Sequence, residues 1–373
     1  MAQHFVAPRY EDLTLANVMP SVVARLGGEE PTIAIPRAQR YVVLLVDGLG
    51  WHQLAEHGDY AETMSAAMAG SQRLTCSVPS TTATSLTSLG TGVPTGEHGV
   101  VGYSFEEPTV GRVINALTWA GGPSDVTGFA QTPTLFQRMT HAGRSCAAVT
   151  LDRFAGSALT RIAFAGTRHF PVSAEGDPEH FSDLVAEALQ DSQVVYAYER
   201  MLDHDGHGHG VGSWQWLDRL GTVDDTVARL AETLPADVCL LVTGDHGMVN
   251  VGEASRLVVE QEPRLAGYRA LGGEPRFRHV YTDDAAATAW AWASVLGERA
   301  EVLRREEAIE AGWFGPRVTG LSEARIGDVV AAMTGDFAAM SLATPGEFSL
   351  IGMHGSLTAA EMEVPLLAFG AGR

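Results

Sequence analysis

The segment Val238-Cys-Leu-Leu-Val-Thr-Gly-Asp245-His246 is a short apolar run that ends in an acid and an imidazole. An earlier run, Tyr41-Val-Val-Leu-Leu-Val-Asp47, also ends on an acid. Continuous apolar runs of this length are typical of strands buried on both faces, as in a parallel sheet covered by helices. The two runs therefore predict buried strands whose ends carry polar side chains.

Strand and helix patterns alternate through much of the chain. Apolar runs at residues 146–150, 194–198 and 364–369 predict further strands, and residues 213–234 repeat apolar side chains at helical spacing. This alternation predicts an α/β fold with a mostly parallel central sheet and helices on both faces. We interpret residues 1–373 as a single domain.

One long stretch interrupts this alternation. Between His246 and His354 lie 107 residues, with helical composition at 284–309 and many turn residues at 312–320. We predict that residues 250–350 form a smaller subdomain or lid inserted into the main domain. Glycine and proline punctuate residues 102–143, which predicts a loop over the functional site.

Charge restricts the classes of ligand that the chain can bind. Its 373 residues carry a formal net charge of −20, without a long acidic block. A negative surface argues against nucleic-acid polymers and anionic membranes as main partners. A small phosphate ligand would need a local positive centre, which a bound metal could supply.

The sequence also bears on the cellular compartment. Residues 1–9 lack the pattern of a signal peptide, and no apolar run reaches the roughly 18 residues that span a bilayer. Cys76, Cys146 and Cys239 lie in or beside apolar runs, without metal-ligand spacing. We expect small buried thiols in a reducing compartment, and hence a cytoplasmic protein without disulfides.

Acid and imidazole groups also follow the run at residues 194–198, in Asp203-His-Asp-Gly-His207. One such strand end is ordinary turn chemistry, but three that deliver Asp and His to one sheet edge favour a metal site. Carboxylate with imidazole suits zinc, and manganese or iron stay open because affinity alone does not select the metal.

A hydroxyl-rich segment, Val78-Pro-Ser-Thr81-Thr82, turns into a predicted helix. Serine and threonine at such a junction are commonly plain N-caps, but a helix start also favours negative charge. The glycines that follow, Gly90, Gly92 and Gly96, miss the spacing of a dinucleotide-binding turn. We interpret them as turn and packing residues.

Motifs from residue 41 to about 370 carry a resemblance. They are Val-Asp47-Gly-Leu-Gly, Pro-Ser-Thr-Thr82 with Gly-Thr-Gly-Val-Pro-Thr-Gly-Glu-His-Gly, Asp203-x-x-Gly-His207, Thr-Gly-Asp245-His246-Gly-Met and Met-His354-Gly. In this order they resemble the alkaline phosphatase superfamily, and within it the type I phosphodiesterase/nucleotide pyrophosphatase family.

The resemblance implies two divalent metal ions and a threonine nucleophile. Seven positions match its metal ligands: Asp47, Thr82, Asp245 and His246 for one ion, and Asp203, His207 and His354 for the other. Thr82, not Thr81, aligns with the nucleophile by its distance of ten residues before Gly92. Two ions about 3.5–4 Å apart can hold the attacking and leaving oxygens of an in-line displacement.

One expected group is missing. The resemblance predicts an asparagine shortly after His98-Gly, where it would hold a phosphate oxygen, and Tyr103 stands there. Tyr103 or Asn115 could take this role, or both could be structural. We expect His98 to pack the turn, and His204 and His209 to face solvent or support the ligands from behind.

The sequence thus predicts a two-metal hydrolase that cleaves a phosphodiester or phosphoanhydride bond of a small nucleotide-type substrate through a phosphothreonine intermediate. A phosphomonoesterase, a phosphonate hydrolase and a non-catalytic metal- or phosphate-binding module are the alternatives. The charges of two divalent ions would balance those of three aspartates and an alkoxide, which leaves the site near neutral. Residues 77–103 contain no Lys or Arg that could pair with a second phosphoryl charge, so a monoanionic diester is favoured as the substrate. Arg276 and Arg278 are candidates for an extra basic group from the inserted stretch.

Overall fold

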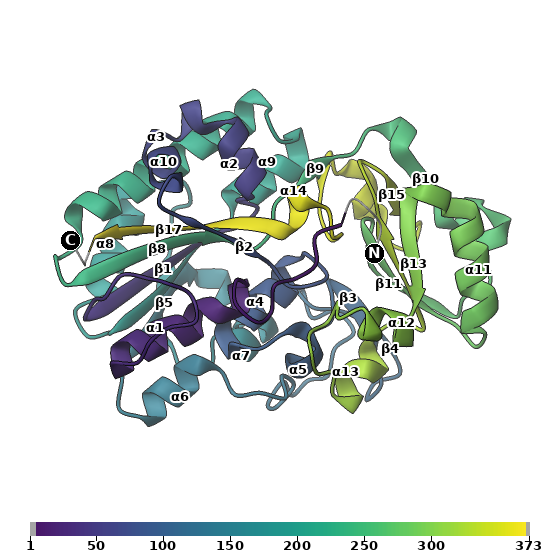
Figure 1. Cartoon of the computed structure of the whole chain (residues 1–373), viewed down its shortest axis with the longest axis horizontal. Helices are drawn as coiled ribbons and strands as arrows, with labels where there is room; N and C mark the ends of the chain where they lie inside the picture. Colours follow the sequence, from purple (N-terminus) through teal and green to yellow (C-terminus); the bar gives the residue numbers. More distant parts are fainter. Residues whose placement is uncertain (1–4, 371–373) are drawn as a thin grey trace.

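The computed structural model describes residues 5–370, so residues 1–4 of the N-terminal stretch considered above lie outside it. Seven strands form the central sheet in the order β2-β17-β8-β1-β7-β5-β6 (Figure 1). Their bounds are β1 Arg40–Val46, β2 Gln72–Thr75, β5 Cys146–Leu151, β6 Arg168–Val172, β7 Val194–Glu199, β8 Val238–Gly244 and β17 Glu363–Gly370. Within this sheet β17 runs antiparallel to both of its neighbours, β2 and β8, and the other strand pairs are parallel. The predicted α/β fold with a mostly parallel sheet is confirmed.

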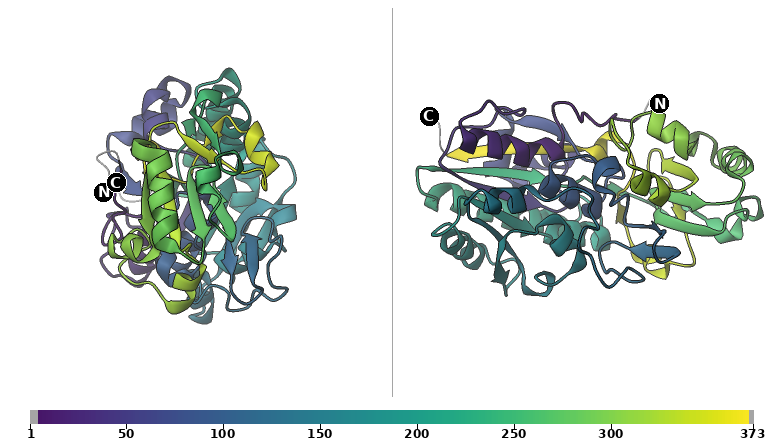
Figure 2. Two further views of the ribbon diagram at one scale, coloured as in Figure 1. Left: turned by 90° about the vertical axis from the view of Figure 1, so that its right-hand side faces the viewer. Right: turned by 90° about the horizontal axis from the view of Figure 1, so that it is seen from below.

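Helices cover both faces of this sheet (Figures 1 and 2). One face carries α1 Val18–Gly27, α4 Thr82–Thr91, α6 Leu135–His141 and α7 Ala158–Ala163. The other carries α2 Trp51–Glu56, α3 Glu62–Met68, α8 Pro178–Ala188, α9 Met201–His209 and α10 Trp214–Thr233. Along β1, Val43 and Leu45 pack into the first core, and Val42 and Leu44 into the second. Burial of both faces explains why the strands read as continuous apolar runs.

The predicted helix at residues 213–234 is confirmed as α10. Ser213 caps its start, where the side chain accepts a hydrogen bond from the Trp216 backbone N–H. Trp216, Leu220, Val223 and Val227 lie on the buried face, at the spacing that the sequence showed.

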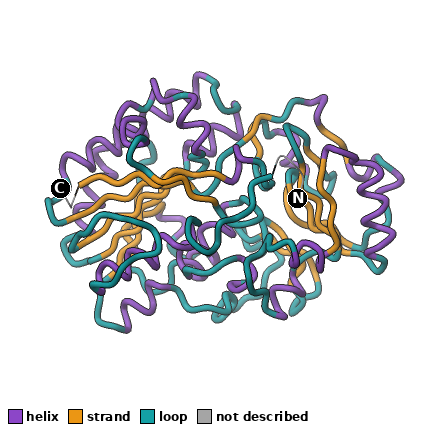
Figure 3. The backbone as a smooth tube through the Cα atoms, in the orientation of Figure 1, coloured by secondary structure: helices purple, strands orange, loops and turns teal. Residues whose placement is uncertain are grey.

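A smaller antiparallel sheet lies beside the central sheet, as the second group of strands in Figure 3 shows. Its order is β11-β12-β14-β13, with β11 Ala270–Glu274, β12 Phe277–Tyr281, β13 Ala300–Arg304 and β14 Val329–Met333. Helix α11, Ala285–Leu296, packs on it through Trp292.

The helical pattern at residues 284–309 is only partly correct. Helix α11 ends at Leu296, and the next residue, Gly297, has a φ of 56° that an L side chain rarely adopts. The chain then forms β13, because Val302 and Leu303 pair with β14, before the short helix α12 Arg305–Glu310. Pairing with a neighbouring strand outweighs local helix propensity here.

Shorter elements connect the two sheets. The remaining strand pairs are β3 Ser104–Glu107 with β4 Arg112–Asn115, β9 Val249–Asn250 with β16 Gly352–Met353, and β10 Arg256–Val258 with β15 Ala338–Met340. The remaining α-helices are α5 Thr95–His98, α13 Gly320–Arg325 and α14 Ala359–Met362. The predicted loop at 102–143 thus contains the β3–β4 hairpin. Among the described helices, none combines the length and apolar character that crossing a bilayer requires.

Candidate metal centre and cavity

Asp47, Asp245 and His246, which we call the inner group, meet at the ends of β1 and β8. The strands pair in parallel with Val46 opposite Gly244, so Asp47 and Asp245 leave the sheet level with each other. His246 Nε2 lies 3.5 Å from Asp47 Oδ1 and 3.5 Å from Asp245 Oδ2. All three side chains are buried.

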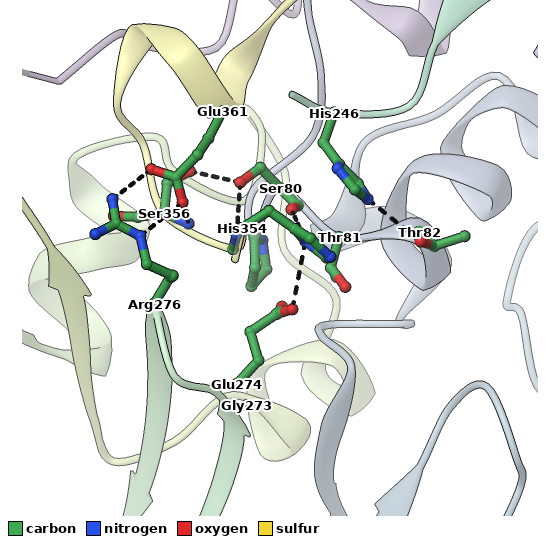
Figure 4. A network of polar contacts seen from close by, with 12 residues as sticks. Ser80, Thr81, Thr82, His246, Gly273, Glu274, Arg276, His354, Ser356 and Glu361 are labelled. Carbon is green, nitrogen blue, oxygen red and sulfur yellow. Dashed lines mark hydrogen bonds and ion pairs between the residues drawn. The ribbon is translucent and has the colours of Figure 1, made fainter. Parts of the chain in front are cut away.

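Thr82 is the first residue of α4, and its hydroxyl lies beside the inner group (Figure 4). Its Oγ1 lies 3.3 Å from His246 Nε2 and 3.5 Å from Asp47 Oδ1. Thr81 precedes it as the N-cap, with extended backbone. The Thr82 oxygen therefore occupies a helix start, where free N–H groups favour negative charge.

Asp203, His207 and His354, which we call the outer group, come from α9 and from the segment after β16. His207 Nε2 lies 3.3 Å from Asp203 Oδ2, and His354 Nε2 lies 3.9 Å from Asp203 Oδ1. The His354 ring stacks on the His246 ring with centroids 3.7 Å apart. The inner and outer groups therefore adjoin.

The three histidines of these groups have the same tautomer. Each bonds through Nδ1 to a backbone carbonyl: His207 to Gly352 at 2.8 Å, His246 to Gly247 at 3.0 Å and His354 to Ser80 at 2.9 Å. Because a carbonyl oxygen can only accept, Nδ1 carries the proton and Nε2 keeps its lone pair. Such an arrangement orients Nε2 as a metal ligand.

Unsatisfied acids in both groups fit bound cations. Asp245 Oδ2 and Asp203 Oδ1 are buried without a hydrogen-bond partner among the described residues. Burial, and then the charges of Asp245 and Asp203, raise the pKa of Asp47 well above its usual value. Ligand atoms of Asp47, Asp245 and His246 lie within 4.8 Å of one another, as do those of Asp203, His246 and His354. These residues therefore form two candidate metal sites.

Two supporting side chains were not identified from the sequence. Tyr198, near the end of β7, donates its hydroxyl to Asp47 Oδ2. Glu274 of β11 lies with Oε2 3.5 Å from His354 Nδ1, and burial raises the pKa of this carboxyl well above its usual value. Tyr198 lies at the end of the apolar run that precedes Asp203 and His207, a signal that could have found it. Glu274 has no such signal, because only the smaller sheet brings it to the site.

A cavity of about 640 Å³ adjoins Thr82 and both groups. Tyr103 is among the described residues that line it. Asn115 instead holds a turn, where its Oδ1 accepts hydrogen bonds from the backbone N–H groups of Leu117 at 3.0 Å and Thr118 at 2.8 Å. The Asn115 side chain also hydrogen-bonds Tyr103, but of the two residues only Tyr103 is among the described residues that line the cavity.

The other histidines of these motifs lie apart from the two groups. His98 is buried at the end of the short helix α5, where Nδ1 accepts from the Val100 N–H and Nε2 lies 2.9 Å from Ser88 Oγ. Burial lowers its pKa to about 3. His204 is exposed and lines the cavity, and His209 is exposed near the end of α9.

The hypothesis of a basic group supplied by Arg276 or Arg278 is wrong. Arg276 pairs with both Glu361 oxygens at 3.0 and 2.6 Å, and Arg278 with both Glu347 oxygens at 3.0 and 2.5 Å. Both arginines are buried. These carboxylates neutralise both guanidinium groups, so neither arginine can pair with an extra phosphoryl charge.

Solved structures share this architecture. Murine ectonucleotide pyrophosphatase/phosphodiesterase 5 superposes with a TM-score of 0.68 at 18% identity, covering 89% of this chain and 88% of that one. Phosphonoacetate hydrolase from Sinorhizobium meliloti, solved with phosphonoformate, gives 0.67 at 20% identity, covering 89% and 90%. These likenesses establish the fold.

A curated relative matches over a shorter stretch. The catalytic subunit of human GPI ethanolamine phosphate transferase 3 is 29% identical over 125 residues, which is 32% of this chain. The match spans 11% of the length of that relative.

The α/β fold and the family match together assign the chain to the alkaline phosphatase superfamily. The model of the family "Type I phosphodiesterase / nucleotide pyrophosphatase" matches residues 41–357. The chain belongs to this family.

Proposed function

We propose that the protein is a two-metal hydrolase that cleaves a phosphodiester or phosphoanhydride bond of a small nucleotide-type substrate through a phosphothreonine intermediate. The observation that carries the proposal is the Thr82 hydroxyl, 3.3 Å from His246 Nε2 and lining the cavity. A buried hydroxyl at a helix start, beside acids and imidazoles, suits a nucleophile better than a plain N-cap.

The chain's own residues define the displacement. Thr82 Oγ1 attacks phosphorus, the hydroxyl proton passes to water in the cavity, and the bond to the leaving oxygen breaks with its electron pair. Water then attacks the phosphothreonine and restores the hydroxyl. When bound at the inner and outer groups, two divalent ions supply the positive charge that lowers the pKa of the hydroxyl and offsets the phosphoryl oxygens.

Tyr103 is the proposed partner of a non-bridging phosphoryl oxygen. It lines the cavity together with Thr82, and its hydroxyl can donate where the resemblance predicts an amide. Asn115 is the weaker candidate because it is not among the described residues that line the cavity.

Zinc is the proposed metal at both groups, with manganese or iron as alternatives. The donors are carboxylate oxygens and imidazole Nε2 atoms, which suit zinc. A nucleotide-type substrate is consistent with an inactive variant of the murine relative, which has been solved with AMP.

We also propose a cytoplasmic location. The described cysteines, Cys76, Cys146 and Cys239, are all buried and free, as a reducing compartment permits.

Hydrolysis of a chromogenic diester, with zinc added or chelated, tests the proposal. We expect zinc-dependent turnover, with a higher kcat/KM for the diester than for the matching monoester or phosphonate. A faster monoester or phosphonate would overturn the diester preference. Turnover of none of the three would overturn the enzymatic proposal.

A further inference from the structure

The cavity beside Thr82 is lined by charges of both signs. Acids of the inner and outer groups line it, and so do Arg153 and Arg200. Arg200 directly follows β7, and Arg153 lies in the 3-10 helix that follows β5. In the strand order β1-β7-β5, β7 is the first neighbour of β1 and β5 is the second. With about 4.8 Å between neighbouring strands, the end of β7 lies one spacing from the end of β1, and the end of β5 lies two spacings away.

One carboxylate serves both arginines. Glu175 Oε1 lies 2.7 Å from Arg200 Nε, and Glu175 Oε2 lies 3.0 Å from Arg200 Nη2. Arg153 Nη1 approaches the same carboxylate only at 3.7 Å. Two guanidinium groups against one carboxylate leave one positive charge in excess, and these distances assign it to Arg153.

Arg153 is also accessible to a ligand. Its side chain is 55% exposed, and its guanidinium carbon lies 5.0 Å from the centroid of the Phe154 ring. This contrasts with Arg276 and Arg278, which are buried in two-point ion pairs. In a chain with a net charge of −20, a cation at the cavity wall is a local feature that selects ligands by charge.

We propose that Arg153 binds a second anionic group of the substrate, carried on one ester arm about two strand spacings from the reacting phosphorus. The inference rests on the proposed diester hydrolysis and narrows its substrates to esters or anhydrides that bear a carboxylate or a second phosphoryl group. Phe154, Leu159 and Tyr198 line the same cavity, so an apolar body between the two charges would contact them. A planar guanidinium suits either anion.

Three esters that release 4-nitrophenolate test this inference. Their second arms are phenyl, 4-carboxyphenyl and 4-phosphonophenyl, so the esters differ only in the remote anion. We expect Arg153→Gln to lower kcat/KM for the charged esters about tenfold relative to the phenyl ester, mainly through KM. Whichever charged ester shows the larger loss identifies the preferred anion.

Two further variants separate charge recognition from general damage. Glu175→Gln removes the competing carboxylate, so the preference for charged esters rises above that of the natural protein. Arg168→Gln is the matched control, because Arg168 also pairs with a single acid, Asp191 at 3.3 Å, and lies 4.4 Å from an aromatic ring, that of Phe170. It is not among the cavity residues, and the substrate preference stays unchanged.

Binding to the Thr82→Ala protein, measured by calorimetry with the same esters, is the readout that does not need turnover. An Arg153-dependent affinity for charged esters without turnover in the natural protein would uphold the inference and overturn the proposed hydrolysis. Turnover with equal effects of Arg153→Gln on all three esters, in rate and in binding, would overturn the inference alone.

Discussion

The inner and outer groups contain the same chemical donors in different surroundings. Asp47, Asp245 and His246 extend from two paired strands and have side chains at most 5% exposed. In the outer group, the side chains of His207 and Asp203 are 24% and 14% exposed. The inner group is therefore held by the rigid sheet edge and is almost fully buried, whereas two of the three outer side chains, Asp203 and His207, are partly exposed in the cavity.

The inner and outer groups suit different tasks. The inner group lies against Thr82, so an ion there would act on the nucleophile. The outer group lies against the cavity from which substrate arrives, so an ion there would act on the oxygens of the substrate. Burial strengthens electrostatic interactions, so we expect the inner group to hold its ion more tightly.

The largest expected effect is that of Thr82→Ala. Removing the nucleophile should reduce diester turnover roughly 10³-fold or more, with folding and metal content retained. Turnover and circular dichroism check this, with Thr81→Ala as the milder neighbouring control. A dead Thr81→Ala with an active Thr82→Ala would shift the nucleophile by one residue.

Metal content in paired variants compares the two groups directly. The Asp203→Asn protein should lose the outer ion and keep the inner one. The Asp245→Asn protein should lose the inner ion and bind the outer ion less tightly, because Asp245 lies 3.5 Å from His246, which contributes ligand atoms to both clusters. Elemental analysis after graded chelation checks the order of release. Loss of the inner ion first would contradict the assigned difference.

Arg276 connects the smaller sheet to the outer group, as Figure 4 shows. It pairs with Glu361, whose Oε1 accepts the Ser356 N–H two residues after His354. Arg276→Met leaves a buried carboxylate unpaired, which should cost about 3–5 kcal/mol of unfolding free energy. The substitution should also weaken metal binding at the outer group more than at the inner group.

Denaturant unfolding and metal titration measure the two effects of Arg276→Met. Glu361→Gln serves as the companion variant, because it removes the other half of the same ion pair. An unchanged free energy of unfolding would show that the Arg276–Glu361 pair contributes nothing to stability. An unchanged metal affinity at the outer group would show that the pair does not support His354.

The smallest expected effect concerns acid stability of the smaller sheet. His279 is buried, with Nε2 2.9 Å from the Val101 carbonyl and Nδ1 accepting the Gly327 N–H, and burial lowers its pKa to about 4. A depressed pKa favours the folded state above about pH 6.5, and this stability is lost as the pH falls toward 4. The slope should reach at most about 1.4 kcal/mol per pH unit.

Unfolding curves between pH 7 and 4 measure that slope. His279→Gln should flatten it, even if the variant is less stable throughout, whereas His209→Gln at an exposed position should leave it unchanged. An equal slope in the His279→Gln protein would assign the acid sensitivity to other groups.

Much of the fold could be predicted from sequence because buried parallel strands are continuous apolar runs. The apolar runs that precede Asp47 and Asp245 predicted both the strands of the central sheet and the acids of the inner group. The smaller sheet was harder, since β13 has a helix-like composition and becomes a strand only by pairing with β14. Short antiparallel strands in an insert depend on partners that local patterns do not reveal.

The candidate site divides in the same way. Residues in motifs, such as Thr82 and His354, could be predicted from the sequence alone, whereas Glu274 and Arg153 reach the cavity only through tertiary structure. Arg276 illustrates the converse error, because a sequence cannot distinguish a free arginine from one whose charge is paired. Pairing depends on Glu361, far away in the chain.

The stereochemical course at phosphorus tests the central claim most directly. A diester made chiral at phosphorus with sulfur and oxygen isotopes is hydrolysed, and the configuration of the product is determined. Two successive in-line displacements through Thr82 each invert phosphorus, so the account predicts net retention. Net inversion would mean that water attacks the substrate directly, and the phosphothreonine mechanism would be wrong.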